Sequence, residues 1–343
     1  ANTLHKKGLA VQPICFGISF TNTMMNQASA LIHIYSDGSV SISTGAVEMG
    51  QGVNTKIAQT AMMVLGVSEQ TVKVQSTNTS RAANTSPTAA SAGADLNGKA
   101  TELASEALRE RLLAVARKEL AANDSDILML KNEKVWKNGS ETTLTWKALV
   151  HSAFMQRVKL SEQAQYSTPL IHFDKTTMQG RPFAYHVYGT AIIEVTVDCL
   201  RGIYEVDNVQ VVHDFGRSFN RTVDVGQAEG AIMQGIGWMT MEEVIYADNG
   251  RLLTDALSTY KIPDIYAAPK QIDVRFLESS DNPLGLMNSK AVGEPPFMYG
   301  IGAYFALMNA IKAYRTDATL LLKAPMSPER VLTELYEPIG ELI

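Results

Sequence analysis

Residues 29–44 read SALIHIYSDGSVSIST, and apolar and polar residues alternate on both sides of Asp37-Gly38. Alternation of this kind is typical of half-buried β-strands, and an Asp-Gly step between two such runs is a strong hairpin signal. The next residues are GAVEMGQG and then VNTKIAQTAMMVLG, in which apolar residues recur at helical spacing and Gly66 is placed to end the helix. The predicted order is therefore strand, turn, strand, Gly-Gln step and helix.

The same order recurs later in the chain. Residues 190–215 predict a second hairpin that turns at Leu200 to Gly202, and the following DVGQAEGAIMQGIGWMTMEE again places a Gly-Gln step at the start of an apolar helix. We interpret the recurrence as a divergent internal duplication. It predicts an α+β fold of two layers, with helices packed on mixed sheets. It also predicts two halves, residues 1–155 and 156–343, each with one hairpin–helix unit.

Three further segments separate or follow the two copies. Residues 99–121 predict a long amphipathic helix that is broken at Asn123 and Asp124. Residues 161–189 show little periodicity, and a loop of that length usually covers a site or wraps a partner. Residues 297–314 read FMYGIGAYFALMNAIKAY, which is too apolar for a surface helix, so we expect this helix to be buried.

The composition excludes several classes of protein. The 343 residues are 45% hydrophobic and 19% charged, with a formal net charge of −5, which describes a globular protein. Since no basic run is present, nucleic acid and anionic membranes are not expected as partners. Cys15 and Cys199 are the only cysteines and lie far apart. A disulfide framework, an iron–sulfur site or a cysteine-based zinc site within this chain is therefore not expected.

The start of the sequence predicts a processed or truncated piece of a longer protein. The first residue is Ala1 rather than methionine, and ANTLHKKGLAVQP contains no start signal. Nothing resembles a signal peptide, and no apolar run reaches the roughly 18 residues that span a bilayer. Together with the cysteine usage, these features predict a cytoplasmic location.

The two Gly-Gln steps, Gly50-Gln51 and Gly226-Gln227, are predicted at helix N-termini. A helix N-terminus presents backbone N–H groups and the positive end of the dipole, which favour an anion. The glutamine amide adds a donor and an acceptor for the edge of a heterocycle. Taken singly, each step is better explained as a plain turn into a helix, but the recurrence in both copies supports a binding role.

Residues 84–98, NTSPTAASAGADLNG, form a run of small residues before the predicted helix that begins near Lys99. Such a run is either a flexible surface loop or a cradle, because small side chains let backbone amides approach a ligand closely. It matches neither a Walker motif nor a dinucleotide fingerprint, so nucleotide binding of those kinds is not expected.

Residues 290–296, KAVGEPP, hold one glutamate between a glycine and two prolines. Proline is tolerated in the first turn of a helix, so the stretch could be only a stiff helix start. Glutamate is not a preferred N-cap residue, so an aimed acid or base is the alternative, although the local sequence by itself favours the helix start. The six histidines do not have the spacing of metal ligands. The sequence also contains no GxSxG motif, which would predict a nucleophilic serine. Any chemistry would then combine this carboxylate with a bound cofactor.

Six motifs in this order resemble the molybdopterin-binding part of xanthine dehydrogenases, in the molybdenum hydroxylase family. They are FGISFT (16–21), EMGQG (48–52), NTSPTAAS (84–91), VGQAEGA (225–231), STYKIP (258–263) and KAVGEPP (290–296). The likeness extends from about Lys6 to about Arg315. It implies the fold of the molybdenum cofactor-binding domain, with duplicated hairpin–helix units.

The resemblance also implies roles for single residues. The glutamate of GEPP is the family's general base beside molybdenum, which points to Glu294. Phe20 and Thr21, the FT of GISFT, would border a purine through the ring and the hydroxyl. The metal is held by the pterin dithiolene and by no protein side chain. The implied cofactor-binding residues are Gly50, Gln51, Ala89, Ala90, Ser91 and Gln227.

The implied activity is hydroxylation of purines, from hypoxanthine to xanthine to urate, with oxygen derived from water. An aldehyde or another N-heterocycle is an alternative substrate, and a non-catalytic cofactor-binding lobe is a second alternative. The family's glycine-rich FGGK-type motif, substrate-binding arginine and second glutamate are not found in this sequence. The implied partners are therefore the N-terminal half of the molybdopterin subunit, parts that carry 2Fe-2S clusters and FAD, and a second copy of the whole complex. The electron acceptor, NAD or oxygen, stays open.

Overall fold

The computed structural model describes residues 4–278, 280–317 and 322–336. Contacts within the chain divide it into two compact units. Unit 1 comprises residues 1–16, 186–281 and 292–343, and unit 2 comprises residues 17–185 and 282–291. The predicted boundary between residues 155 and 156 falls inside unit 2. The halves 1–155 and 156–343 thus separate the two sequence repeats rather than the two units, and they stay a proposal.

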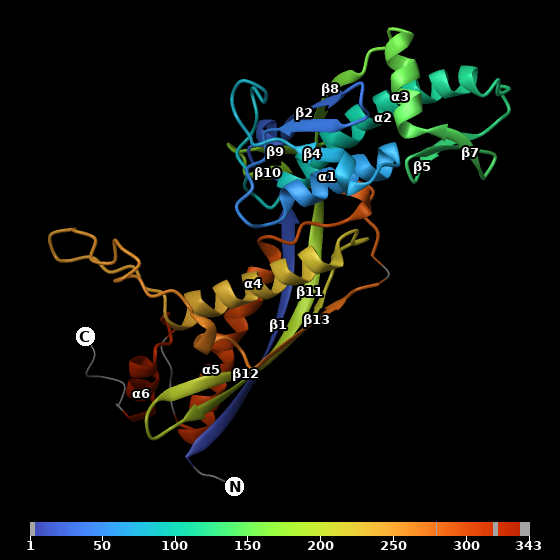
Figure 1. The fold of residues 1–343 in the computed structure, drawn as a ribbon. Coiled ribbons are helices and arrows are strands. Elements are labelled where there is room, and N and C mark those ends of the chain that lie inside the picture. The colour runs from blue at the N-terminus through green and yellow to red at the C-terminus, as the bar shows by residue number, and fades with distance from the viewer. Residues whose placement is uncertain (1–3, 279, 318–321, 337–343) are drawn as a thin grey trace. The chain divides into compact units, whose positions relative to one another are not determined.

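Unit 2 contains a four-stranded mixed sheet with the strand order β4-β3-β2-β8. Figure 1 labels β2, β4 and β8 of this sheet. Strand β2 pairs antiparallel with β3 and with β8, whereas β3 and β4 are parallel. The predicted hairpin at Asp37-Gly38 is confirmed, because it joins β2 to β3. The four strands are β2 (Gln27–Ile34), β3 (Val40–Thr44), β4 (Val72–Val74) and β8 (Ser161–Ser167).

The helices of unit 2 are α1 (Val53–Leu65), α2 (Gly93–Glu119) and α3 (Trp146–Met155). Helix α1 ends as predicted at Gly66, whose φ of 66° is left-handed and whose N–H donates to the Met62 carbonyl at 2.8 Å. Two smaller sheets and three 3-10 turns complete the unit. One sheet consists of β5 (Leu128–Lys131), β6 (Lys134–Lys137) and β7 (Ser140–Thr145), and the other of β9 (His172–Asp174) and β10 (Gln179–Arg181). The 3-10 turns are η1 (Thr23–Met25), η2 (Glu69–Thr71) and η4 (Leu286–Asn288).

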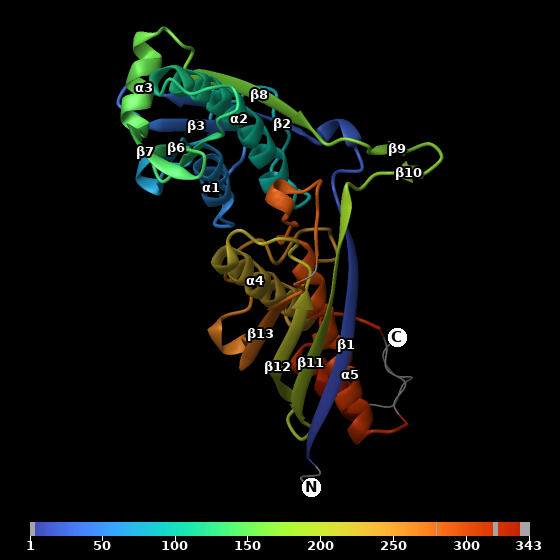
Figure 2. The same ribbon diagram turned by 90° about the vertical axis from the view of Figure 1, so that its right-hand side faces the viewer.

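Unit 1 contains a second four-stranded sheet, with the order β1-β11-β12-β13 (Figure 2). Strand β11 pairs antiparallel with β12 through the predicted turn at Leu200 to Gly202, and β12 pairs parallel with β13. Strands β1 and β11 each extend by one or two residues into unit 2. The strands are β1 (His5–Ile18), β11 (Tyr185–Asp198), β12 (Ile203–His213) and β13 (Gln271–Phe276).

The helices of unit 1 are α4 (Arg221–Thr240), α5 (Ile301–Tyr314) and α6 (Pro328–Tyr336), with 3-10 turns η3 (Ile265–Ala267) and η5 (Pro295–Gly300). The apolar segment 297–314 forms part of η5 and all of α5. Ala303, Ala306 and Leu307 are fully buried in α5, as predicted, although Phe305 is 42% exposed. No helix in the described part of the chain combines the length and the apolar character needed to traverse a bilayer.

Both sheets contain the same succession of hairpin, helix and parallel strand, which confirms the duplicated hairpin–helix pattern. In unit 2 the hairpin β2–β3 is followed by α1 and by β4, which is parallel to β3. In unit 1 the hairpin β11–β12 is followed by α4 and by β13, which is parallel to β12. The fourth strand lies beside the first hairpin strand in both, as β8 and β1.

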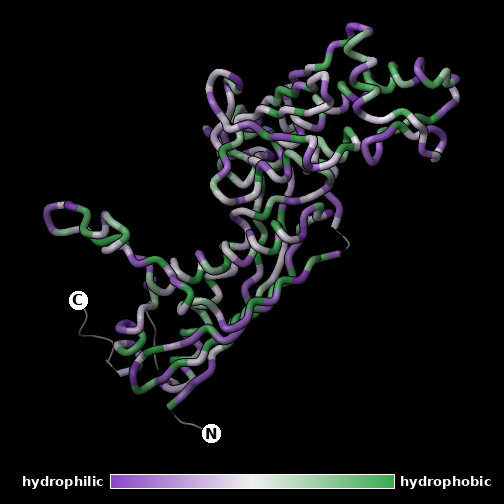
Figure 3. Tube along the Cα trace, in the orientation of Figure 1, coloured by the Kyte–Doolittle hydropathy of each residue, from purple (hydrophilic) through white to green (hydrophobic). Residues whose placement is uncertain are grey.

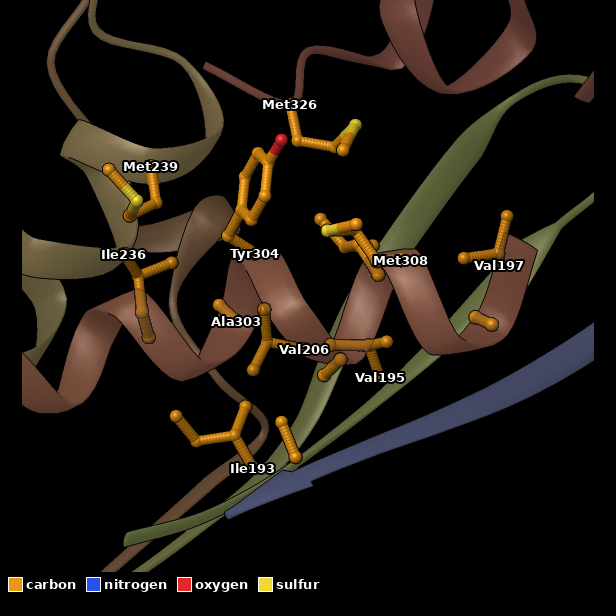
Figure 4. Close-up of a cluster of buried hydrophobic side chains, with 14 of the residues drawn as sticks. Ile193, Val195, Val197, Val206, Ile236, Met239, Ala303, Tyr304, Met308 and Met326 are labelled. Carbon is orange, nitrogen blue, oxygen red and sulfur yellow. The ribbon is translucent and has the colours of Figure 1, made fainter. Parts of the chain in front are cut away.

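The core of unit 1 lies between one face of its sheet and helices α4 and α5 (Figure 4). Ala191 and Ile193 of β11 are fully buried, whereas Ile192 between them is 42% exposed. Side chains of a strand alternate between its two faces, which explains this difference in burial. Hydrophobic and hydrophilic residues both occur along the long strands of the sheet (Figure 3). In unit 2, Ile32 and Ile42 pack in the same way with residues of α1, α2 and α3. The predicted two-layer α+β architecture is confirmed.

Two predictions about element boundaries were wrong. Helix α2 begins at Gly93 rather than near Lys99, because Leu96 and Ala100 continue its buried face into the small-residue run. The stretch 161–189 is not an irregular loop, since it contains β8, β9, β10 and the start of β11. Its strands were missed because β8, SEQAQYS, lies at a sheet edge and buries little apolar surface.

Candidate functional site

Glu294 lies at the N-terminus of η5, in unit 1. Pro295 and Pro296 occupy the first two positions of this 3-10 helix and are buried, whereas Glu294 itself is exposed. The Glu294 carbonyl accepts a hydrogen bond from the Phe297 N–H at 3.1 Å, but its side chain makes no capping bond. The segment is thus a stiff helix start, and its carboxylate is not used to cap that helix.

Helix α4 holds η5 closely. A Cβ on Gly235 would lie 2.1 Å from the Phe297 carbonyl oxygen, and a Cβ on Gly300 would lie 2.3 Å from the Gly235 carbonyl carbon. Both glycines therefore permit a close approach of the two backbones. The rings of Trp238 and Phe297 stack beside them at 5.3 Å. These contacts restrict the turn that carries Glu294.

Glu294 lines a pocket of about 330 Å³ within unit 1. That volume is at the lower end of the range usual for small-molecule sites. Two larger cavities, of about 420 Å³ and 490 Å³, contain none of the candidate residues. The other residues that line the Glu294 pocket are Phe16, Gln234, Gly293, Phe297 and Met298.

Gln227 lies in the second turn of α4, so its predicted position at a helix N-terminus was wrong. Asn220 caps the helix seven residues before Gln227, because its side chain accepts a hydrogen bond from the Val223 N–H at 3.0 Å. The Gly-Gln step therefore presents its side chain rather than free N–H groups.

One face of α4 links Gln227 to the Glu294 pocket. Gly226, Gln227, Gly230 and Gln234 lie on one face at helical spacing. No atom lies within 4 Å of a Cβ built on Gly226 or on Gly230, so the backbone is open on this face. Seven residues separate Gln227 from Gln234, which is about 10 Å along the helix.

The corresponding step in unit 2, Gly50-Gln51, does precede a helix, but the helix terminus is already capped. Glu48 accepts hydrogen bonds from the N–H groups of Gly50, Gly52 and Asn54 at 2.9–3.0 Å. Burial raises the pKa of Glu48, but these backbone hydrogen bonds outweigh it and keep the pKa below its usual value. The chain's own carboxylate thus takes the place expected for an external anion.

The Gln51 side chain stabilises the same loop. Its amide donates to the Val47 carbonyl at 2.9 Å and accepts from the Met49 N–H. The Val47 N–H in turn donates to the Thr88 hydroxyl at 3.0 Å. Residues 47–52 and the small-residue segment are therefore neighbours, as a shared cofactor wall would require.

The small-residue segment has an unusual backbone. Ala90 and Ser91 both have positive φ, 55° and 52°, which is rare for residues other than glycine, and Ala92 begins α2 without a side-chain cap. Strained residues of this kind persist at ligand sites more often than elsewhere. Ala89 is exposed beside them.

Phe20 lies next to this segment in unit 2. It packs in a small cluster with Ala92 and Leu96 of the α2 start. Asn26 holds its backbone at both ends, because its side chain accepts from the Phe20 N–H at 2.8 Å and donates to the Phe20 carbonyl at 2.9 Å. Thr21 follows and is exposed. The structure therefore brings together Phe20, the segment 89–91 and the Gln51 loop in unit 2. In unit 1 it places Gln227 on the helix face that carries Gln234 of the Glu294 pocket, about 10 Å further along α4.

Sequence reasoning missed a buried polar network in unit 2. Asp95 accepts hydrogen bonds from the Tyr185 hydroxyl and, at 3.0 Å, from the Leu286 N–H. The Tyr185 hydroxyl also accepts from the Ala291 N–H at 3.0 Å. Burial raises the pKa of Asp95, although the hydrogen bonds from Tyr185 and Leu286 act in the opposite direction. A lone aspartate in a run of small residues carried no signal of partners 90 and 191 residues away.

Among the described residues, no group of three or more histidine, cysteine, aspartate or glutamate side chains could hold a metal ion. The predicted candidate residues are thus a carboxylate, amides, a hydroxyl, an aromatic ring and small residues. Such a set offers a proton acceptor and hydrogen-bonding groups for a bound organic molecule.

Comparison with known proteins gives this site a family. Residues 1–269 match the sequence profile described as the molybdopterin cofactor-binding domain. Xanthine dehydrogenase 2 of Arabidopsis thaliana is 38% identical over 98% of this chain, and the mouse xanthine dehydrogenase/oxidase is 39% identical over 96%. Each match covers only 24% of the relative, so the chain spans about a quarter of their length.

Solved structures show the same fold. The quinoline 2-oxidoreductase of Pseudomonas putida 86 superimposes with a TM-score of 0.81 and 25% sequence identity. The match covers 97% of this chain and 42% of that protein. With the family profile matching most of its length, the chain belongs to the molybdopterin cofactor-binding domain family of molybdenum hydroxylases.

Proposed function

We propose that this chain is the catalytic, molybdopterin-binding part of a xanthine dehydrogenase-type enzyme that hydroxylates purines with oxygen from water. The observation that carries the proposal is the placement of Glu294. Its carboxylate lies on a pocket of about 330 Å³, at the start of a helix that it does not cap. The similarity to xanthine dehydrogenases over 98% of the chain supports the same reaction class.

The residues of α4 fit the cofactor. A flat heterocycle could approach Gly226 and Gly230, where an added Cβ would meet no atom within 4 Å. Gln227 on the same face offers one donor and one acceptor to its edge. In unit 2, the positive φ values of Ala90 and Ser91 aim backbone groups in a way that a regular helix start does not. Gln51 would contribute through the loop that its own amide stabilises.

Glu294 would act as the general base. When bound, the cofactor supplies a molybdenum centre that takes up the electrons removed from the substrate. The carboxylate must lie within about 2.6–3.2 Å of the oxygen whose proton it removes, and loss of water around it would increase its basicity. Pro295 and Pro296 limit the backbone freedom on one side of Glu294, which reduces the entropy lost in reaching that geometry.

The test is Glu294→Gln in the complete enzyme that contains this chain. The amide keeps the size of the side chain but cannot accept the proton, so turnover should fall by about 10²–10⁴-fold. Molybdenum content should stay unchanged. Glu329→Gln is the matched control, because Glu329 is also an exposed glutamate at a helix start of unit 1. Turnover of Glu294→Gln within threefold of wild type would refute the assignment.

The substrate is the finer part of the proposal. Phe20 and Thr21 support a purine, whereas the similarity to quinoline 2-oxidoreductase favours another N-heterocycle as the second candidate; an aldehyde is the third. Thr21→Ala should lower kcat/KM for xanthine by about 5- to 150-fold, which corresponds to about 1–3 kcal/mol, because a hydrogen bond to the substrate is lost. An aromatic aldehyde, which lacks that partner, should be affected less than threefold. An equal loss for both substrates would show that Thr21 is structural.

The remaining length of the relatives supports partners for this chain. The proposed partners are the N-terminal half of the molybdopterin subunit and the parts that carry 2Fe-2S clusters and FAD. We also propose that the whole complex forms a dimer and is located in the cytoplasm. A non-catalytic lobe that only stores the cofactor is the alternative to an enzyme. The Glu294→Gln experiment decides between them, because a storage lobe would bind molybdenum equally well with either residue and would show no turnover to lose.

A further inference from the structure

A buried hydrogen bond joins the end of β12 to η5. His213, the last residue of β12, and Tyr299 of η5 are both fully buried. The His213 Nδ1 atom and the Tyr299 hydroxyl are 2.8 Å apart, and either group can donate, according to the ring tautomer. The His213 ring also meets Phe215 edge-on, at 4.5 Å between the ring centroids. A buried polar group without its hydrogen bond lowers the stability of the fold. The pair therefore favours the one arrangement of β12 and η5 in which the two groups meet.

The neighbouring strand leaves room for the Tyr299 hydroxyl. Gly189 of β11 lies directly opposite His213 in the antiparallel register. A Cβ on Gly189 would lie 1.9 Å from the Tyr299 hydroxyl oxygen, so only glycine permits the tyrosine to reach the histidine. Burial, with the charge of nearby Asp214, raises the pKa of Tyr299, and the phenol therefore keeps its proton at neutral pH.

The same short helix begins with Glu294. Tyr299 follows Glu294 by five residues, and η5 links them in a single rigid segment that starts with two prolines. Helix α4 contacts this segment through Gly235, and the sheet contacts it through His213. All of these residues belong to unit 1. The helix is thus held from two directions, by backbone packing and by one oriented hydrogen bond.

We propose that the His213–Tyr299 hydrogen bond positions Glu294 by fixing the orientation of η5 on the sheet. The inference rests on the proposed role of Glu294 as the base. Packing of smooth backbone surfaces allows small rotations of a short helix, whereas a hydrogen bond to a buried ring nitrogen does not. A displacement of about 1 Å at a reacting group can lower the rate by about 100-fold. His213 and Tyr299 would touch neither substrate nor cofactor, so both are positioning residues.

The first experiment is Tyr299→Phe in the complete enzyme. It removes one oxygen atom and keeps the ring. We expect kcat to fall by about 10- to 100-fold, KM to stay unchanged and molybdenum content to stay near that of wild type. Hydrogen exchange of the η5 amides should become faster, which reports on the helix without any catalysis. Tyr204→Phe is the control, because the partly buried Tyr204 hydroxyl donates to the Met326 carbonyl at 2.8 Å, close to the other end of β12.

The double variant His213→Met with Tyr299→Phe separates positioning from simple stability. The two apolar side chains remove both members of the His213–Tyr299 hydrogen bond rather than one, so the melting temperature should lie closer to that of wild type than in Tyr299→Phe. The orienting bond is still absent, so kcat should stay low and η5 exchange should stay fast. If kcat recovers together with the melting temperature, the pair is only structural and the proposal is overturned. A kcat of Tyr299→Phe within twofold of wild type would overturn it as well.

Failure of this inference differs from failure of the proposed function. If Glu294→Gln abolishes turnover while Tyr299→Phe does not lower kcat, the base is correct and the positioning role is wrong. If Glu294→Gln keeps its turnover, the proposed function fails. In that case the exchange rates still decide whether the pair orients η5.

Discussion

The two hairpin–helix repeats share a topology and a Gly-Gln step, yet the step lies at different points of the helix. In unit 2, Gly50-Gln51 precedes α1, whereas in unit 1 Gly226-Gln227 lies inside α4. The difference follows from the residue that caps each helix. Glu48 binds the first N–H groups of α1 from a preceding loop, and Asn220 begins α4 six residues before its Gly-Gln step. A recurring dipeptide therefore identifies the repeat, but the cap decides where the helix begins.

The repeats also differ in what their helices contact. Helix α1 packs on α2 and on the sheet with a buried face that includes Ile57 and Leu65. Helix α4 instead has one face pressed on η5 at Gly235 and another that is open at Gly226 and Gly230. We infer that this repeat was specialised to hold the segment that carries Glu294 and to leave space for the cofactor. Three predictions test the comparison.

The largest effect is expected at the closed face of α4. Gly235→Ala places a methyl group 2.1 Å from the Phe297 carbonyl oxygen, so α4 and η5 must separate. We expect a loss of about 2–3 kcal/mol in the stability of unit 1 and faster hydrogen exchange in η5. Thermal unfolding and exchange measured on the complete enzyme check both effects. Unchanged exchange in η5 would contradict the close packing.

The two caps should differ in their dependence on pH. Glu48→Gln should destabilise the first turn of α1 by about 0.5–1 kcal/mol near pH 7, a modest value because Glu48 is exposed. The folded pKa of Glu48 lies below its usual value of 4.5, so the stabilisation is complete above that pH and is lost as the pH falls through the folded pKa. Hydrogen exchange of α1, compared between variant and wild type at pH 7 and pH 3, measures the change.

Asn220→Ala is the matched variant in the other repeat. It should destabilise the first turn of α4 by about 1 kcal/mol, and the loss should be the same at pH 7 and at pH 3, because an amide does not titrate. A difference between wild type and Glu48→Gln that persists unchanged at pH 3 would mean that the carboxylate charge is not the cap.

The smallest effect is expected at the open face of α4. Gly226→Ala adds a methyl group that meets no atom within 4 Å and removes a glycine from a helix interior. The free helix should therefore gain about 0.5–1 kcal/mol. If the open face holds the cofactor, molybdenum content should fall although the helix is more stable. Elemental analysis measures the molybdenum content, and hydrogen exchange measures the stability of α4. A rise in both quantities would show that the cofactor lies elsewhere.

The features that local sequence predicted are those with local causes. Asp37-Gly38 defined the first hairpin because the turn needs a residue with positive φ, which is 89° at Gly38. Gly66 marked the end of α1 for the same reason. The site residues Glu294, Gln227 and Gln51 were predicted by resemblance to the family's motifs, and their roles stay predictions. The capping of α1 by Glu48 and of α4 by Asn220 was not predicted, because several polar residues precede each helix and any of them could have capped it.

What the sequence by itself determined is the order of strands, turns and helices in two repeats, together with the family of the chain. These depend on alternation, helical periodicity and glycine, whose effects act over a few residues. Only the tertiary structure decided which polar groups meet. His213 contacts Tyr299 across 86 residues, and Asp95 contacts Leu286 across 191. Such pairs form because sheet register and helix packing bury both partners together, and a buried polar group must then find a hydrogen bond that no local pattern specifies.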